Sequence, residues 1–459
     1  MIPVTEFQKR SLIGPPILKK HQFTLNFAHK VREIVAKYGI KYNPEFLIGD
    51  DATGELVFQA GADLLAEIGL YHTETRRVVQ FSRQDISEIA KDAWEGPRQV
   101  IFGKGKDKVV VRARDPGDPR QPITFVSAGT PVSREELYIP YLLSFARESV
   151  CDGIYGHPLF IVHGIENKAG TIGEAAAAIA EMTYNKEIAR MVGKPDMFLG
   201  LPGTNSITPT AIITCCSVAG LEPHQTQIPI HIMPEQQINW TRLQLAYYAE
   251  QKGFVPFTNA IGIVGAVCRG PEEATVACMA NLIAQLGYGH GNIGGILIVD
   301  HTATRSSRET LWAAAVAHRA TALHLGIPMG QTNVQSKAGA CTEMALYEKA
   351  AEVLMLLGSG AGWYLAGGCR NGRGADTSSG LEARFIGEVA HAVATLKPKE
   401  ANALLDKVLK VYENQLENAP EGKTFPQCYD VKTITPIPEY VSVYNRAKET
   451  LAKLGMNFK

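Results

Sequence analysis

This chain lacks the features that mark membrane, secreted and nucleic-acid-binding proteins. Its apolar runs stay shorter than the roughly 18–20 residues that cross a bilayer, and its first residues, MIPVTEFQKR, lack the apolar stretch of a signal peptide. Lysine and arginine number 46 together, as do aspartate and glutamate, so no basic surface for a polyanion is indicated. We therefore expect a cytoplasmic protein that binds neither membrane nor nucleic acid.

Cysteine is also scarce. The eight cysteines are scattered over 459 residues and form no Cys-x-x-Cys motif. This scatter is typical of reduced thiols, most of which pack as small hydrophobic side chains. Few of them therefore remain for metal binding or catalysis.

Short apolar runs bounded by glycine or proline recur from about residue 120 onward. Runs of this length predict strands that are buried on both faces. We count eight: PITFVSAG (122–129), PLFIVHG (158–164), DMFLGLPG (196–203), QIPIHIMP (227–234), NAIGIVGA (259–266), GGILIVDH (294–301), LGIPMGQ (325–331) and GWYLAGGC (362–369).

Segments of helical period separate these strands, at the spacing of a (β/α)8 TIM barrel, an α/β fold. An open doubly wound sheet is the alternative, but no Gly-x-Gly-x-x-Gly turn follows the first strand. We expect the barrel to span 121–396. A helical and irregular N-terminal layer would occupy 1–120, and a helical extension would occupy 397–459.

The active site of a barrel lies at the C-terminal ends of its strands. His301, Cys341 and Cys369 follow three successive strands and form a candidate zinc site with one open position. Glu235 and Glu343 form a candidate glycosidase pair. The residues expected at the strand ends are His163, Gly200, His231, Glu235, Asn259, His301, Gln331, Asn333, Cys369 and Arg370, with Cys341 and Glu343 beginning the helix after the seventh strand.

Two basic loops follow neighbouring strands. TATRSSRET and CRNGRG place Arg305, Arg308, Arg370 and Arg373 where a guanidinium could bind a carboxylate or a phosphate. Arg308 precedes Glu309 at a helix start, so a structural role is favoured for that pair. The alternative for the histidine and the two cysteines is ordinary core packing.

Several long motifs together resemble the monomethylamine–corrinoid protein methyltransferases, a family that uses pyrrolysine. They are YHTETRRVV (71–79), SRETLW (307–312), GACTEMALYEKAAE (339–352), GLEARFIGEVAHA (380–392) and APEGKTFPQCYDVKTITP (419–436). The resemblance implies a cytoplasmic, homo-oligomeric barrel. It would transfer a methyl group to cob(I)alamin carried by a separate corrinoid protein, and this chain has no Asp-x-His-x-x-Gly motif of its own.

The resemblance also implies a departure at the site. Gly200 occupies the position that carries pyrrolysine in the family. The two acidic residues that flank pyrrolysine correspond to Gln225 and Asn259, and a polar residue after the seventh strand corresponds to Asn333. A smaller side chain at Gly200 and the loss of two acidic residues predict a larger pocket that repels anions less.

We therefore expect O-demethylation of a methoxylated aromatic acid. Arg305 or Arg370 would bind its carboxylate, while Glu343, His301 or a zinc ion held by His301, Cys341 and Cys369 would assist the leaving oxygen. N-demethylation of a methylated amine is the alternative within the class. A glycoside hydrolase acting through Glu235 and Glu343, or a degenerate member that serves as a binding subunit, are alternatives outside it.

Overall fold

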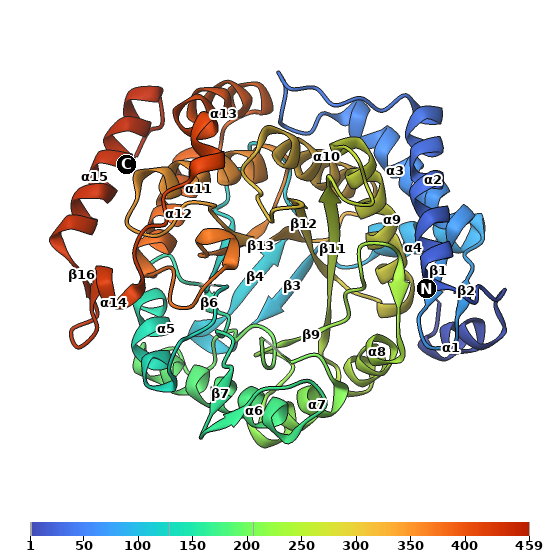
Figure 1. Ribbon diagram of the computed structural model, residues 1–459, viewed down its shortest axis with the longest axis horizontal. Coiled ribbons are helices and arrows are strands. Elements are labelled where there is room, and N and C mark those ends of the chain that lie inside the picture. Colours follow the sequence, from blue (N-terminus) through green and yellow to red (C-terminus); the bar gives the residue numbers. More distant parts are fainter. Residues whose placement is uncertain (1, 128, 205, 459) are drawn as a thin grey trace.

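A parallel sheet lies at the centre of the computed structural model, which describes residues 2–127, 129–204 and 206–458 (Figure 1). Seven strands hydrogen-bond in the order β6-β5-β14-β13-β12-β11-β9. Their bounds are β5 Ile123–Val126, β6 Gly153–Ile154, β9 Gln227–Pro229, β11 Val255–Val264, β12 Ile293–Asp300, β13 Met329–Val334 and β14 Trp363–Ala366.

The segment 197–200 closes this sheet into a barrel. Ile154 donates its N–H to the carbonyl of Phe198 (2.9 Å), and Leu199 donates to the carbonyl of Gln225 (2.7 Å). The segment therefore lies between β6 and β9 as the third of eight strands. The predicted (β/α)8 barrel is confirmed.

One predicted strand is wrong. The run 158–164 is a surface hairpin, β7 (Ile161–Val162) with β8 (Ile165–Glu166), and the second barrel strand is instead β6. Phe160 and Ile161 are 50% and 59% exposed, whereas Leu159 and Val162 are buried, so only part of this apolar run packs in the core. His163 lies in the hairpin turn with an exposed side chain, and not at the end of a barrel strand.

Eight helices surround the barrel, and capping residues set where several of them begin. Ser307 accepts from the N–H of Thr310, and Thr342 from that of Ala345. The helices are α5 Tyr138–Ala146, α6 Ile172–Met191, α7 Pro209–Val218, α8 Trp240–Lys252, α9 Pro271–Gly289, α10 Arg308–His324, α11 Glu343–Gly358 and α12 Gly380–Val393.

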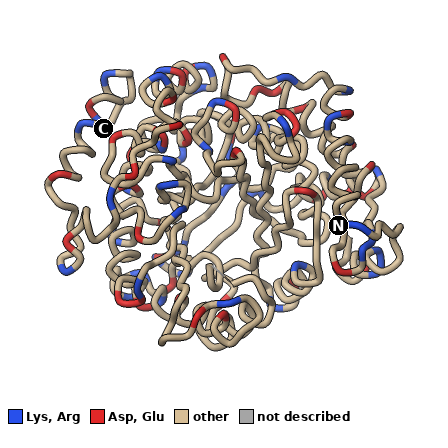
Figure 2. Tube along the Cα trace, in the orientation of Figure 1, with Lys and Arg blue, Asp and Glu red and all other residues tan. Residues whose placement is uncertain are grey.

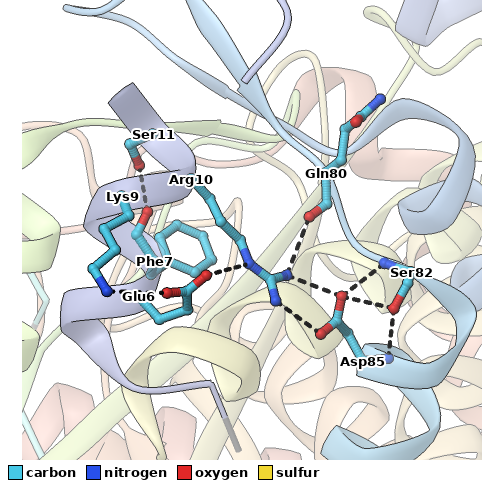
Figure 3. Close-up of polar contacts among 8 residues, drawn as sticks. All are labelled: Glu6, Phe7, Lys9, Arg10, Ser11, Gln80, Ser82 and Asp85. Atoms are coloured by element: carbon cyan, nitrogen blue, oxygen red, sulfur yellow. Dashed lines mark hydrogen bonds and ion pairs between the residues drawn. The ribbon is translucent and has the colours of Figure 1, made fainter. Parts of the chain in front are cut away.

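The N-terminal segment packs outside α9 and α10, so α9 is buried on all sides. Arg10 fastens the first helix, because its guanidinium binds Asp85 at 2.9 and 3.1 Å (Figure 3). The helices of the N-terminal segment are α1 Val4–Ile13, α2 Lys20–Tyr38, α3 Asp51–Ile68 and α4 Arg83–Glu95. Its strands β1 (Leu70–His72) and β2 (Arg77–Val79) form a small sheet with β10 (Gln237–Ile238).

A hairpin of β3 (Gln99–Phe102) and β4 (Val109–Arg112) covers the end of the barrel where the strands begin. Gly103 donates to the carbonyl of His224, just before β9. Phe102 packs on Phe198 with ring centroids 4.2 Å apart. The hairpin therefore covers this end of the barrel and leaves the opposite end, where the strands finish, as the open one.

The C-terminal helices pack against α11, on the side opposite the N-terminal segment in Figure 1. They are α13 Pro398–Tyr412, α14 Phe425–Cys428 and α15 Pro438–Leu454, with a short pair of strands, β15 Tyr429–Asp430 and β16 Thr435–Pro436. Figure 2 shows positively and negatively charged residues interspersed along the chain. Among the described residues, no helix combines the length and the apolar character that a membrane span requires.

Candidate active site

The open end of the barrel has apolar walls above a polar layer. Asn259 of β11 pairs in register with Gly295 of β12. A Cβ on Gly295 would lie 2.7 Å from Oδ1 of Asn259 and 3.4 Å from the ring of Phe257, so these side chains point into the barrel. Because side chains alternate along a strand, the same inner face carries Ile261, Ile263, Leu297 and Val299, all partly exposed.

Aromatic side chains form the floor of this space. Phe125, Phe198, Phe257 and Trp363 pack together beneath Asn259. The ring of Tyr155, which follows β6, lies 5.5 Å from that of Phe198 and completes the layer.

Gly200 lies at the tip of the third strand, but the space beside it is filled. Its φ of +72° is in the left-handed region. A Cβ there would lie 2.6 Å from Cγ and 2.7 Å from Cδ1 of Tyr155. The expectation of an enlarged pocket at Gly200 is therefore wrong, because the ring of Tyr155 stands where another side chain would be. Asn205, farther along the same stretch, lies outside the described residues.

Gln227 holds this ring. Its Nε2 donates to the hydroxyl oxygen of Tyr155, and its Oε1 has no hydrogen-bond partner among the described residues. Burial raises the pKa of Tyr155 far above its usual value, so the phenol stays neutral. Sequence reasoning missed both residues, since placing the second strand at 158–164 left Tyr155 in a loop.

The three amide residues expected at the site differ in their roles. The side chain of Gln225 turns back and accepts from the N–H of Glu222 (3.3 Å), closing a turn. Oδ1 of Asn259 accepts from the hydroxyl of Thr332 (3.3 Å), across Gly295. Asn333 has a left-handed φ of +64°, and its Oδ1 is buried with no partner among the described residues.

Arg305 supports the site from behind β13. Its Nη1 donates to the carbonyls of Thr332 (2.6 Å) and Asn333. Burial lowers its pKa to about 10, against the opposing effect of nearby Glu352. Arg305 thus stabilises the backbone at the end of β13, and the expectation that it binds a substrate carboxylate is not supported.

Glu352 belongs to a buried polar network on α11. Its carboxylate accepts from Nε2 of Gln331 and from the N–H of Gln335 (3.0 Å), and burial raises its pKa to about 8. Glu348 accepts from the hydroxyl of Ser306 (2.6 Å) and from the N–H of Ala338 (2.9 Å). The network fixes the loops after β12 and β13.

Arg370 faces a cleft on the rim and not the barrel interior. It forms an ion pair with Glu421 of the C-terminal extension. The cleft has a volume of about 320 Å³ and also contains Lys337, Arg373 and Thr302. Arg370 is therefore placed to contact a molecule on the rim, but not a donor at the floor.

Glu343 and Glu235 do not form a pair. The carboxylate of Glu343 binds Arg446 of α15 (2.6 Å) and the hydroxyl of Tyr347 (2.9 Å), on the outside of the barrel. Glu235 borders a narrow cleft with Phe27 and Cys268. The structure therefore does not support the catalytic role expected for Glu343, because α11 turns this residue toward the C-terminal helices.

The expected zinc ligands are not assembled either. His301 is exposed beside Gly265, whose Cβ would lie 2.9 Å from Nδ1. Cys369 is buried and directs its thiol to Glu382 (3.7 Å), and burial raises the pKa of Cys341 to about 11. Among the residues that the structure describes, no three histidine, cysteine, aspartate or glutamate side chains gather to hold a metal ion.

Comparison with known proteins supports the resemblance along the full chain. A model of the family described as monomethylamine methyltransferase MtmB matches residues 2–456. The monomethylamine methyltransferases of Methanosarcina acetivorans and Methanosarcina mazei are 32% and 31% identical, with 99% of this chain and 98% of each relative covered. The crystal structure of the Methanosarcina barkeri monomethylamine methyltransferase superposes with a TM-score of 0.93 and 28% identity, covering 100% of this chain and 99% of that one. The chain is therefore a methyltransferase that belongs to the monomethylamine methyltransferase family.

Proposed function

We propose that this protein transfers a methyl group from an N-methylated ammonium compound to cob(I)alamin on a separate corrinoid protein. The relatives that match over the whole chain are named monomethylamine methyltransferases. The observation that carries the choice of donor is the position of Glu343 and His301, the two expected acids. Neither is directed to the floor of the barrel.

The leaving group decides how much an acid matters. When the methyl group is transferred from an ammonium ion, the carbon–nitrogen bond breaks, its electrons stay on nitrogen, and a neutral amine departs. When it is transferred from an ether, an alkoxide or phenolate departs and must be protonated or stabilised. Because neither Glu343 nor His301 is directed to the floor, the two acids expected for an ether donor are not in place, and this favours the ammonium donor.

The floor of the barrel suits such a cation. Ammonium ions bind over the faces of aromatic rings, and each methyl group on the nitrogen weakens the hydration of the cation. Tyr155 offers a ring face, Gln227 an unpaired oxygen, and Ile261 and Leu297 apolar walls. These groups would hold the methyl group toward the open end.

The corrinoid is a co-substrate carried by another protein, and it supplies the nucleophile that accepts the methyl group. It can approach only from the open end, because β3 and β4 cover the other. The rim there fits a large polar partner, since its cleft contains Lys337, Arg370 and Arg373.

Demethylation of a methoxylated aromatic compound is the second candidate. Gln227 donates to the oxygen of Tyr155, so the phenolic proton remains available for a leaving oxygen. The apolar walls at Ile261 and Leu297 would accept a ring. The filled space beside Gly200 is the feature that disfavours this donor.

The test is methylation of the cob(I)alamin-loaded corrinoid protein, followed by the absorbance of the cofactor. We expect methylation with methylammonium, dimethylammonium or trimethylammonium and none with methoxybenzoates. Methylation by methoxybenzoates alone would select the second candidate. No methylation by either class would contradict the proposed function.

A further inference from the structure

Tyr155 is the least buried ring of the aromatic floor formed with Phe125, Phe198, Phe257 and Trp363. Its exposed fraction is 3%, whereas Phe125, Phe198 and Trp363 are 0% exposed and Phe257 is 1% exposed. Its position is fixed from two sides. The ring rests against Gly200, and the hydroxyl accepts from Gln227.

Gln227 carries an unsatisfied group beside this ring. The residue is fully buried, and its Oε1 has no partner among the described residues. Buried polar atoms are almost always hydrogen-bonded, and an exception in a native protein calls for an explanation. An N–H from a ligand at the floor would satisfy this oxygen.

The hydroxyl of Tyr155 is also only partly used. A phenol oxygen can accept and donate, and here it accepts from Nε2 of Gln227 alone among the described residues. Tyr155 and Gln227 therefore present two oxygens and one ring face, and no carboxylate, to a molecule bound above them.

We propose that Tyr155 and Gln227 bind and orient the methyl donor, and that they select methylated ammonium ions that retain at least one N–H. Methylammonium, dimethylammonium and trimethylammonium can donate to Oε1 of Gln227 while their charge lies near the ring of Tyr155. Tetramethylammonium has no N–H, so it leaves that oxygen unsatisfied. This inference rests on the proposed methyl transfer and names its substrate class.

The experiment measures the affinity for the donor by calorimetry, without the corrinoid protein, alongside KM and kcat in its presence. Tyr155→Phe keeps the ring and removes the hydroxyl, and Gln227→Met removes the oxygen and keeps the length. Loss of a hydrogen bond to a charged ligand weakens binding roughly tenfold to hundredfold. We expect a loss of this size for methylammonium in both variants and for trimethylammonium, which has one N–H, in Gln227→Met, with kcat changed less than KM.

Tyr364→Phe is the matched control. Tyr364 is also buried and its hydroxyl also accepts one hydrogen bond, from Thr124 (2.7 Å), but on the outer side of the sheet. We expect this variant to bind donors as the wild type does. Gln227→Glu should instead increase the affinity for trimethylammonium, because it places a carboxylate beside the cation. The affinity of this variant should then fall at acidic pH, where the carboxylate is protonated.

The outcomes separate the two proposals. A wild type that methylates the corrinoid protein, but whose donor affinity is unchanged in both Tyr155→Phe and Gln227→Met, contradicts the role of this pair alone. Equal affinity for trimethylammonium and tetramethylammonium contradicts the selection for an N–H. If the wild type methylates the corrinoid protein from no ammonium donor, the proposed function itself is contradicted. Circular dichroism and thermal unfolding establish that each variant folds.

Discussion

Gly200 and Tyr155 lie at the ends of neighbouring barrel strands, and the ring of Tyr155 excludes a side chain at Gly200. A Cβ on Gly200 would lie 2.6 Å from Cγ of Tyr155, far inside van der Waals contact. The hydrogen bond from Ile154 to Phe198 (2.9 Å) fixes the separation of the two strands. Gly200 is thus required by its neighbour and does not mark an empty pocket.

Gly200→Ala should destabilise the protein through two effects. A left-handed backbone costs alanine about 1–2 kcal/mol, and overpacking against a buried ring adds about 1–3 kcal/mol. Urea denaturation should therefore show a loss of about 2–5 kcal/mol in the free energy of unfolding. The backbone effect should persist in any variant that keeps φ at +72°.

A second variant isolates the clash. Tyr155→Val removes the ring, so Gly200→Ala should destabilise the protein less in that background. The interaction free energy between the two changes should be about 1 kcal/mol or more, as expected for residues in contact. Strict additivity would show that the ring moves freely and does not require a glycine. The same double-mutant cycle measures both the stability and the affinity for trimethylammonium.

The sequence allowed the barrel to be predicted because its strands are short, apolar and bounded by glycine or proline. Seven of the eight runs correspond to barrel strands, and residues 197–200 lie between β6 and β9 as the third. The second run failed because PLFIVHG is as apolar as a buried strand but lies on the surface. The strand that replaces it, Gly153–Ile154, is too short to show a pattern.

The site was harder to predict, since strand position does not give the direction of a side chain. Glu343 follows the seventh strand as expected, but the first turn of α11 directs it to Arg446. Arg305 follows the sixth strand and turns inward to the carbonyls of β13. Tyr155 could have been found only from a correct second strand.

The stability of the protein should decrease as the pH rises, in part because of Glu181. This residue of α6 accepts from the N–H of Thr204, 2.9 Å from each carboxyl oxygen, and desolvation raises its pKa to about 8. The folded state therefore keeps a proton that the unfolded chain releases near 4.5. Between these two values the free energy of unfolding falls with a slope that approaches about 1.4 kcal/mol per pH unit.

Glu181→Gln should remove this contribution, because glutamine does not titrate and its oxygen still accepts from Thr204. Urea denaturation at pH 5, 6, 7 and 8 should show the variant gaining stability relative to the wild type with each step. Below the unfolded-state pKa the two proteins should differ little. Parallel curves would mean that Glu181 is ionised in the folded protein.

Glu343→Gln should leave methyl transfer almost unchanged. Its carboxylate binds Arg446 on the outside of the barrel, and both side chains are partly exposed. A pair of this kind contributes about 0–1 kcal/mol to stability. We expect kcat and KM within about twofold of the wild type, as for a surface substitution. A large loss of kcat in a folded variant would restore Glu343 as a catalytic residue.

Arg305→Met distinguishes support of the backbone from recognition of a substrate. The change leaves the carbonyls of Thr332 and Asn333 without a donor and Glu352 without its nearby cation. Leaving buried acceptors without a donor costs about 1–3 kcal/mol, so urea denaturation should show a loss of at least this size. Adding Glu352→Gln should change little at neutral pH, because desolvation raises the pKa of Glu352 to about 8 and keeps it mostly protonated. If Arg305 instead bound a carboxylated donor, the single variant would keep its stability and lose affinity for methoxybenzoate alone.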